Sequence, residues 1–333
     1  MKQLLSALIL AGAGFGAMAE PANRVVLVID RINEVRNLPA ALAESLGYFK
    51  EEGLLVTLTE GRDEVPTEQL LEDGRADASM AFYHHTIMSQ VAGHASVSVI
   101  DLGISPALTL MVATRLKDQV KTVADLKGKK IFTGGANSGK TTTANWLMSH
   151  AGLGNNDFTR LPLQDRDKMA AALASGEADA IVAHEPDASY YQKTGAAVAI
   201  ADITTPEGTK KSLGSLFPTT SVYMTEEYVK SHPDQVQHLV NALVKTLKFI
   251  NSHKASEVWA ALPKEIAGKD AKTYQEDLER DLPMFFTNGL LPEADAKMEF
   301  KVFTEFQPKY AGAKFEPTYT NKFVEAALKA NRL

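Results

Sequence analysis

The 333-residue sequence contains no cysteine, has no excess of positive charge, and has no long apolar run after its N-terminal segment. Without cysteine no disulfide can form, so the core must hold the fold unaided, which a chain of this length can do. The 35 Lys and Arg residues against 41 Asp and Glu give a net charge of −6, which argues against a nucleic-acid partner. Because no apolar run of about 18 residues or more follows the N-terminal segment, a protein that crosses the membrane several times is excluded.

The N-terminal segment has a different composition from the rest of the chain. Lys2 precedes an apolar stretch at residues 4–10 and a run of small residues that ends in Ala-Met-Ala at residues 17–19. A charged start, a short apolar core and small residues before a cleavage point are typical of a secretory signal peptide. We therefore predict that residues 1–19 are removed after Ala19 and that the protein is periplasmic. The absence of cysteine at the cleavage point excludes a lipoprotein anchor.

The whole sequence, 45% apolar and 23% charged, has the composition of a globular protein. Apolar runs rich in β-branched residues at 24–30, 54–60 and 77–83 predict buried strands, with helical patterns between them. This alternation predicts a parallel, doubly wound sheet. A C-terminal helix begins near Pro233, and its apolar positions recur at helical spacing: Val236, Leu239, Val240, Leu243, Val244 and Leu247.

Two segments of the chain resemble each other. Residues 71–81 read LEDGRADASMA, and residues 173–183, which lie 102 positions later, read LASGEADAIVA. Each describes a helix end, a glycine that stops the helix, and an Asp that opens a buried strand. The spacing is far longer than that of a solenoid repeat. It therefore predicts two related α/β lobes.

Two composition breaks set the expected lobe boundaries. Residues 117–125 are charged, and residues 204–218 are rich in Thr, Gly, Ser and Pro. Two breaks imply that the chain enters the second lobe once and returns once. We predict lobe I at residues 24–112 plus 219–333 and lobe II at residues 113–215.

Residues from Gly134 through Thr141 match the phosphate-binding pattern G-x-x-x-x-G-K-[ST], after a predicted strand and before a predicted helix. A P-loop NTPase is therefore an alternative of another class, with Lys140 on the phosphates. An exported domain meets little ATP, however, and no strand clearly supplies the Asp that would hold a metal ion. A helix N-terminus with free N–H groups, suited to an anionic group, is the more general prediction.

Histidines follow two of the predicted strands. His84 and His85 end the strand of the first lobe, and His184 with Glu185 ends the matching strand of the second. Together they could bind zinc, which takes three or four such ligands. Adjacent residues on an extended chain point in opposite directions, so one His of the first pair would face a cleft. Hydrogen-bonding walls, with no metal, are the expectation.

Ligands of open α/β sheets lie beyond the carboxyl ends of the strands. In this sequence those ends carry four cations: Arg31, Arg36, Arg62 and Lys140. An anionic ligand such as a carboxylate or sulfonate would be held by them. Nearby carboxylates, namely Glu34, Asp63 and Glu185, could instead neutralise some of these cations.

The sequence resembles the periplasmic substrate-binding proteins of ABC importers. The residues that carry the resemblance are GYFKEEGL at 47–54, VADLKGKKI at 123–131 and ALASGEADA at 172–180, within a match over about residues 25–262. The group it most resembles is the NMT1/THI5-like family, which includes sulfonate, taurine and nitrate binders. The resemblance implies a two-lobed, type II periplasmic binding protein fold with two hinge crossings.

The resemblance also implies a set of pocket residues. They come from both lobes: Asn33, Arg36, Arg62, Tyr83, His84, Asn137, Ser138, Thr141, His184 and Glu185. Residues 31–38 lack the aromatic side chains of many relatives, and His-His-Thr at 84–86 replaces small residues. The ligand's identity therefore stays open. A fungal enzyme of the family, which makes the thiamine pyrimidine, depends on cysteines that this chain lacks, but a binder of a thiamine-pyrimidine precursor remains an alternative.

We therefore expect a monomeric receptor that delivers a small organic, anionic ligand such as a sulfonate or an aromatic carboxylate to an inner-membrane ABC permease. The lobes would close on the ligand about the two crossings. No enzymatic activity, cofactor or resident metal is expected. Presentation of the closed form to a membrane sensor is a further role that the residues do not separate from transport.

Overall fold

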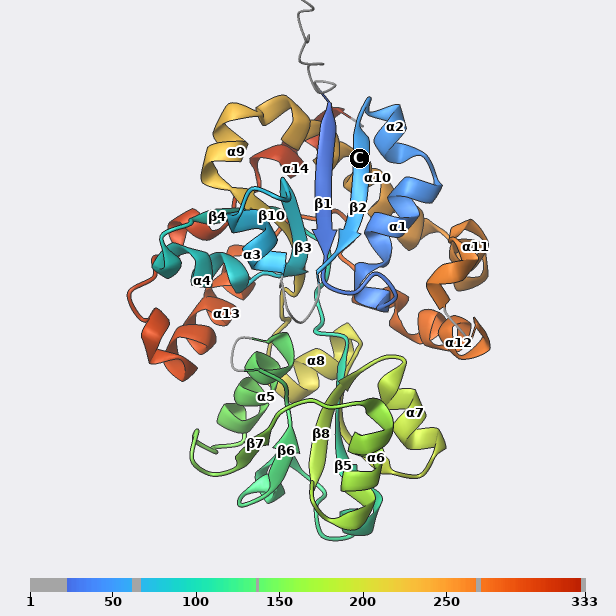
Figure 1. Cartoon of the computed structure of the whole chain (residues 1–333), viewed down its shortest axis with the longest axis vertical. Helices are drawn as coiled ribbons and strands as arrows, with labels where there is room; N and C mark the ends of the chain where they lie inside the picture. The colour runs from blue at the N-terminus through green and yellow to red at the C-terminus, as the bar shows by residue number, and fades with distance from the viewer. Residues whose placement is uncertain (1–22, 62–66, 136–137, 268–270, 331–333) are drawn as a thin grey trace, which may run out of the picture.

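The computed structural model describes residues 23–61, 67–135, 138–267 and 271–330, and it shows two α/β lobes stacked one above the other (Figure 1). The predicted signal peptide lies outside these residues, as do Arg62 and Asn137 of the predicted pocket. Each lobe is built on one five-stranded sheet covered by helices. None of the helices within the described ranges is long and apolar enough to cross a bilayer.

The two sheets have the same strand arrangement. The first sheet has the order β2-β1-β3-β10-β4 and the second β7-β6-β8-β5-β9. The first consists of β1 (Arg24–Ile29), β2 (Leu55–Glu60), β3 (Ala78–Phe82), β4 (Ser96–Asp101) and β10 (Thr220–Thr225). The second consists of β5 (Leu108–Ala113), β6 (Lys130–Phe132), β7 (Thr159–Leu161), β8 (Ala180–His184) and β9 (Ala197–Ile203).

Each sheet contains one strand that runs against its neighbours. β1 pairs in parallel with β2 and β3, and β6 pairs in parallel with β7 and β8. In contrast, β10 is antiparallel to β3 and β4, and β5 is antiparallel to β8 and β9. β5 and β10 are the strands that follow the crossings between lobes. Because they start at the edge where the parallel strands end, they must run in the opposite direction, so the expectation of wholly parallel sheets was wrong for these two strands.

The crossing into the second lobe lies earlier in the chain than the sequence indicated. The boundary at residue 113 put the strand at 107–113 in lobe I, but β5 is the fourth strand of the second sheet. The crossing is therefore the segment between Asp101 and Leu108. The sequence of an apolar strand does not indicate which of two sheets the strand will join. The charged segment 117–125, which suggested the boundary, lies inside the second lobe.

The internal repeat is present in the structure. Gly74 and Gly176, 102 residues apart, both adopt positive φ, of 66° and 93°, and end the helices before β3 and β8. A side chain at such an angle would be strained. The Asp that follows each glycine plays the same part in both lobes. Asp77 Oδ2 accepts the Val26 N–H of β1 at 2.7 Å, and Asp179 Oδ2 accepts the Lys130 N–H of β6 at 3.0 Å.

Helices cover both sheets. They are α1 (Leu38–Ser45), α2 (Tyr48–Glu51), α3 (Thr67–Glu72), α4 (His85–Ala92), α5 (Gly139–His150), α6 (Arg166–Ser175), α7 (Asp187–Lys193), α8 (Pro206–Leu213), α9 (Glu226–Ser231), α10 (Pro233–Ser252), α11 (Ala255–Ala261), α12 (Ala271–Asp281), α13 (Glu293–Phe306) and α14 (Lys322–Ala330). The six apolar residues predicted for the helix after Pro233 are all buried in α10, which confirms that helix. α12 and α13 extend from the first lobe toward the second, on opposite flanks (Figure 1).

Candidate functional site

The carboxyl ends of the parallel strands of both lobes meet between the two sheets. The first lobe contributes the segments after β1 and β3, and the second contributes those after β6 and β8. The ring of Phe82, the last residue of β3, lies 6.2 Å from that of His184, the last residue of β8. The same ring approaches Gly139, the first residue of α5, so closely that a Cβ there would overlap it. These contacts lie where the two lobes meet, and we call this region the cleft.

Arg36 is buried in the cleft wall and is held by two carboxylates. Its Nε donates to Glu34 at 2.7 Å and its Nη2 donates to Asp30 at 2.6 Å. The guanidinium also lies 4.9 Å from the centre of the Phe82 ring. Only 1% of the side chain is exposed. Arg36 therefore positions Glu34 and Phe82, and its charge is already neutralised.

Glu34 is an ionised hydrogen-bond acceptor inside the cleft. Burial raises the pKa of its carboxyl, but Arg36, then His184 and Lys140, lower it further than burial raises it, to about 2. Lys140 belongs to the second lobe, so Glu34 of the first lobe faces a positive charge across the cleft. A buried carboxylate kept ionised in this way will accept N–H or O–H donors.

His184 is neutral and its tautomer follows from its partner. Its Nδ1 lies 3.0 Å from the carbonyl oxygen of Ala107, which can only accept, so Nδ1 carries the proton. Burial, opposed by Glu34 and reinforced by Lys140, lowers the pKa of the ring to about 3. Nε2 is consequently an acceptor. Ala107 lies in the crossing with φ of 52°, an uncommon angle for alanine.

Lys140 lies in the first turn of α5, where helix N–H groups have no acceptor within the helix. The pKa of its ammonium is lowered, because burial outweighs the opposing effects of Glu34 from the first lobe and Asp187 from the second. Within the described parts of the chain, no ion pair to Lys140 is formed. Unlike Arg36, Lys140 makes no direct contact with a carboxylate of the described residues.

The residues on either side of Lys140 stabilise the start of α5. Ser138 is the N-cap, and its Oγ accepts the Thr141 N–H at 3.2 Å. The Thr141 hydroxyl, 2% exposed, donates to the Thr133 carbonyl at 3.2 Å. A P-loop would use that hydroxyl on a metal ion. Here both side chains stabilise the loop and the helix start.

Tyr83 and His84, predicted as pocket residues, contact the C-terminal part of the first lobe. Tyr83 Oη lies 2.6 Å from Thr318 Oγ1. His84 Nδ1 lies 3.2 Å from Glu299 Oε1, and its ring stacks on Phe303 at 4.8 Å between centroids. Phe82, which the sequence reasoning missed, is the aromatic residue that meets the second lobe. Tyr83 and His84 follow the end of β3 and contact the first lobe, so the sequence reasoning named the neighbours of Phe82 and not Phe82 itself.

Two further predicted residues lie at the edges of the cleft. Asn33 is exposed. Glu185 is buried and its Oε1 lies 2.7 Å from Arg280 Nη2 on α12. Burial raises the pKa of Glu185 to about 7, with Arg280 opposing and Asp277 adding to the rise. Glu185 therefore contacts the opposite lobe directly.

The histidines do not form a metal site in the described structure. Across residues 23–61, 67–135, 138–267 and 271–330, no three His, Asp or Glu side chains are grouped to hold a metal ion. His85 contacts Glu68 at 2.5 Å and Tyr223 at 3.0 Å, inside the first lobe. His184 Nδ1 is bonded to the carbonyl of Ala107 in the crossing.

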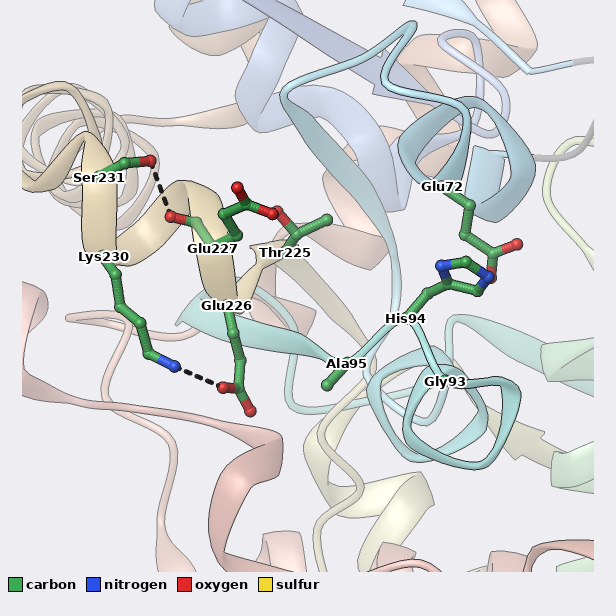
Figure 2. Close-up of a pocket in the computed structure, with 9 residues that line it drawn as sticks. All are labelled: Glu72, Gly93, His94, Ala95, Thr225, Glu226, Glu227, Lys230 and Ser231. Atoms are coloured by element: carbon green, nitrogen blue, oxygen red, sulfur yellow. Dashed lines mark hydrogen bonds and ion pairs between the residues drawn. The ribbon is translucent and has the colours of Figure 1, made fainter.

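A separate groove lies on the first lobe between the ends of α3, α4 and α9 (Figure 2). It is lined by Glu72, Gly93, His94, Ala95, Thr225, Glu226, Glu227, Lys230 and Ser231. Because β10 begins beside Phe82 and ends at Thr225, this groove is at the edge of the sheet opposite the cleft. Strand polarity therefore favours the cleft as the functional site.

Comparison with known proteins places the chain in a family. The profile of the family described as NMT1/THI5 like matches residues 36–256. A Bacillus subtilis protein named "Putative binding protein YtlA" is 24% identical over 77% of this chain and 75% of its own length. A Saccharomyces cerevisiae 4-amino-5-hydroxymethyl-2-methylpyrimidine phosphate synthase, THI13, is 24% identical over 64% of this chain and 63% of its own length.

Solved structures share the fold over nearly the whole chain. A protein from Bordetella bronchiseptica RB50 superposes with a TM-score of 0.80 and 26% identity, covering 93% of this chain and 98% of that one. The alkanesulfonate-binding protein SsuA from Xanthomonas axonopodis, bound to MOPS, gives a TM-score of 0.70 and 20% identity, covering 91% and 99%. The two-lobed architecture is thus that of periplasmic binding proteins, and the chain belongs to the NMT1/THI5-like family.

Proposed function

We propose that this protein is a periplasmic receptor that encloses one small organic anion between its lobes and delivers it to an ABC permease in the inner membrane. The observation that carries the proposal is the cleft of both lobes, in which Lys140 is a cation at a helix start without a direct carboxylate partner among the described residues. An anionic group such as a carboxylate or sulfonate would bind there.

The cleft also selects for hydrogen-bond donors. Glu34 is an ionised acceptor and His184 Nε2 is a neutral one, as their pKa values of about 2 and about 3 imply. Glu34 Oε2 already accepts from Arg36, but a ligand with only an acidic group would offer no donor to His184 Nε2 or to the other Glu34 oxygen, which is costly once water is excluded. We therefore expect a ligand that carries N–H or O–H donors in addition to its acidic group. Micromolar affinity requires about −8 kcal/mol, within reach of two or three charge-assisted bonds and contact with Phe82.

A precursor of the thiamine pyrimidine is the second candidate ligand. Glu34 and His184, two acceptors close enough to interact electrostatically, suit the donors of an aminopyrimidine. The similarity to the yeast synthase adds support. An enzyme of the yeast kind is not proposed, because the chain lacks the cysteines on which that reaction is expected to depend.

The P-loop alternative finds less support. In that reading the Thr141 hydroxyl would bind a metal ion, but it is buried and bonded to the Thr133 carbonyl. Ser138, another residue of the motif, likewise has a structural role, because its hydroxyl caps the start of α5.

A thermal-shift screen of the chain from Glu20 onward tests the proposal. The panel contains alkanesulfonates, aminosulfonates, aromatic carboxylates and 4-amino-5-hydroxymethyl-2-methylpyrimidine, together with MgATP and zinc chloride. A ligand at a hundredfold excess over its Kd adds about 2.7 kcal/mol to the free energy of unfolding. Stabilisation by an organic solute, without any by MgATP or zinc, is the expected result. Stabilisation by MgATP or zinc alone would contradict the receptor.

A further inference from the structure

The flank of the cleft formed by α12 and α7 contains polar contacts that join the lobes. α12 is anchored in the core of the first lobe by Tyr274 and Leu278. α7 is anchored in the core of the second by Ala188 and Tyr191. Any contact between these two helices therefore depends on how the lobes are placed relative to each other.

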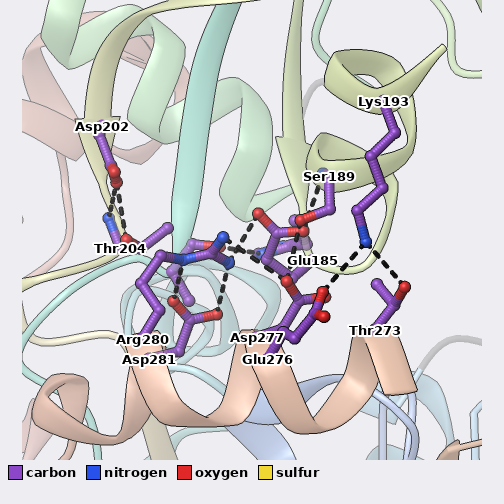
Figure 3. A network of polar contacts seen from close by, with 12 residues as sticks. Glu185, Ser189, Lys193, Asp202, Thr204, Thr273, Glu276, Asp277, Arg280 and Asp281 are labelled. Atoms are coloured by element: carbon purple, nitrogen blue, oxygen red, sulfur yellow. Dashed lines mark hydrogen bonds and ion pairs between the residues drawn. The ribbon is translucent and has the colours of Figure 1, made fainter. Parts of the chain in front are cut away.

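Four contacts form a ladder between α12 and the segment of the second lobe that consists of Glu185 and the following helix α7 (Figure 3). Arg280 Nη2 lies 2.7 Å from Glu185 Oε1. Ser189 Oγ donates to Asp277 Oδ1 at 2.8 Å. Lys193 Nζ donates to Thr273 Oγ1 at 2.8 Å and to Glu276 Oε2 at 3.4 Å.

The sequence spacing of the ladder fits two facing, antiparallel surfaces. Glu185, Ser189 and Lys193 are four residues apart from each other along the second lobe. Their partners follow in reverse order on α12, at positions three and four residues apart. Such spacings place the partners on one side of α12, and Ser189 and Lys193 on one side of α7. Glu185 precedes α7 and meets the C-terminal end of α12. The contacts thus lie in one line between the two lobes, so a movement of one lobe relative to the other would form or break them together.

Arg280 is held in place by its own helix before it reaches across. Its Nε donates to Asp281 Oδ1 at 2.8 Å and its Nη2 to Asp281 Oδ2 at 3.1 Å. A bidentate pair fixes the plane of the guanidinium. Less side-chain entropy is therefore lost when Arg280 meets Glu185 across the cleft.

We propose that the ladder between α12 and α7 is a latch that stabilises the closed arrangement of the lobes and thereby sets ligand affinity without touching the ligand. The inference rests on the hinge closure of the proposed function. A contact present only in the closed state shifts the balance between open and closed. Where the closed state is the minor state of the free protein, every tenfold loss in its population weakens apparent affinity tenfold.

Single-molecule fluorescence transfer between the lobes tests the latch without a ligand. Because the chain has no cysteine, Glu44→Cys on α1 and Lys168→Cys on α6, both exposed, can be labelled selectively. In this background Arg280→Ala is compared with Arg115→Ala. Arg115 is a matched control, since its side chain is 33% exposed against 34% for Arg280, and it pairs with Asp179 inside the second lobe.

The latch predicts that Arg280→Ala lowers the ratio of closed to open molecules by about tenfold, the order of a partly buried charge pair. Ser189→Ala, which removes one neutral hydrogen bond, should lower it by about threefold. Arg115→Ala should leave the ratio unchanged. An unchanged ratio in Arg280→Ala and Ser189→Ala would overturn the latch. Should Arg280→Ala fail to fold, Ser189→Ala decides by itself.

The outcome is independent of the ligand. A receptor with another ligand class would still show the shift between open and closed. A protein whose lobes do not move would show one distance in all variants, and this would overturn both the latch and hinge closure. Loss of the ligand proposal alone would leave the distance change intact.

Discussion

The contact between Gly139 and Phe82 makes closure of the lobes sensitive to a single methyl group. A Cβ built on Gly139 would lie 2.6 Å from Phe82 Cδ2 and closer still to two other atoms of the ring. The ring cannot move away freely, because it is 4% exposed and lies between Arg36 and the histidines. Gly139→Ala should therefore hinder closure.

The size of the effect follows from where the two residues lie. Overpacking of one methyl group costs about 1–3 kcal/mol. Gly139 belongs to the second lobe and Phe82 to the first, so the cost falls on the closed state and leaves each separate lobe intact. Ligand affinity should fall by about 5- to 150-fold. The melting temperature without ligand should not fall, since alanine favours the helix.

Isothermal titration calorimetry with the solute identified in the thermal-shift screen measures this loss. Phe82→Leu combined with Gly139→Ala restores space and should recover part of the affinity lost by Gly139→Ala alone. Phe82→Leu by itself corrects for any contact between the ring and the ligand. Equal affinity in the parent chain and in Gly139→Ala would refute the close approach of the lobes.

Three further changes test other parts of the site. Lys140→Met should weaken binding of an anionic solute by at least about tenfold, whereas Lys127→Met, at an exposed position of the second lobe, should not; equal losses in calorimetry would remove Lys140 from the site. The pKa of His184 is about 3 in the folded chain, below its unfolded value, so its contribution to stability is present near neutral pH and is lost as pH falls from about 6.5 toward 3. Between pH 7 and pH 5 the buried neutral ring should lower the free energy of unfolding by about 2 kcal/mol. In urea unfolding, the free energy of unfolding of His184→Gln should fall less between pH 7 and pH 5 than that of the parent chain, by this amount. An identical pH dependence in the two proteins would contradict the buried neutral ring. Ser138→Ala, which removes the N-cap of α5, should lower the free energy of unfolding by about 1 kcal/mol in the same assay, and no change would show that the cap bond is dispensable.

Local patterns in the sequence were sufficient to predict the framework of the fold. The apolar run of β1, the helical periodicity of α10 and the glycines that end the paired helices all appear in the structure. The repeat was informative because each of its residues has a local role. Asp77 and Asp179, for example, each bind a backbone N–H of a neighbouring strand.

Features that depend on long-range placement were not predictable. The sheet that β5 joins is decided by where the chain crosses, and no residue of the strand encodes that choice. Arg36 was expected in the pocket as a cation, but its neutralisation requires Asp30 and Glu34 to converge on it. The sequence indicated Glu34 as a candidate partner of the cations, but it could not show which cation Glu34 neutralises.

The candidate site was predictable mainly at its centre. The segments after β1, β3, β6 and β8 do meet, as the rule for open α/β sheets requires. Phe82 was missed because its neighbours, Tyr83 and His84, carry the more conspicuous polar groups. Arg280 was missed because α12 lies about a hundred residues after Glu185, and only the fold brings them together.

The central claim, that the lobes enclose a small anion, is tested most directly by a crystal structure of the chain with the solute identified by thermal shift. We predict one molecule in the cleft, with its acidic group at Lys140 and the first turn of α5. Its donors should lie near Glu34 and His184, and the lobes should be closed about it. A solute bound in the groove beside α9, or on an outer face with the cleft empty, would contradict the account.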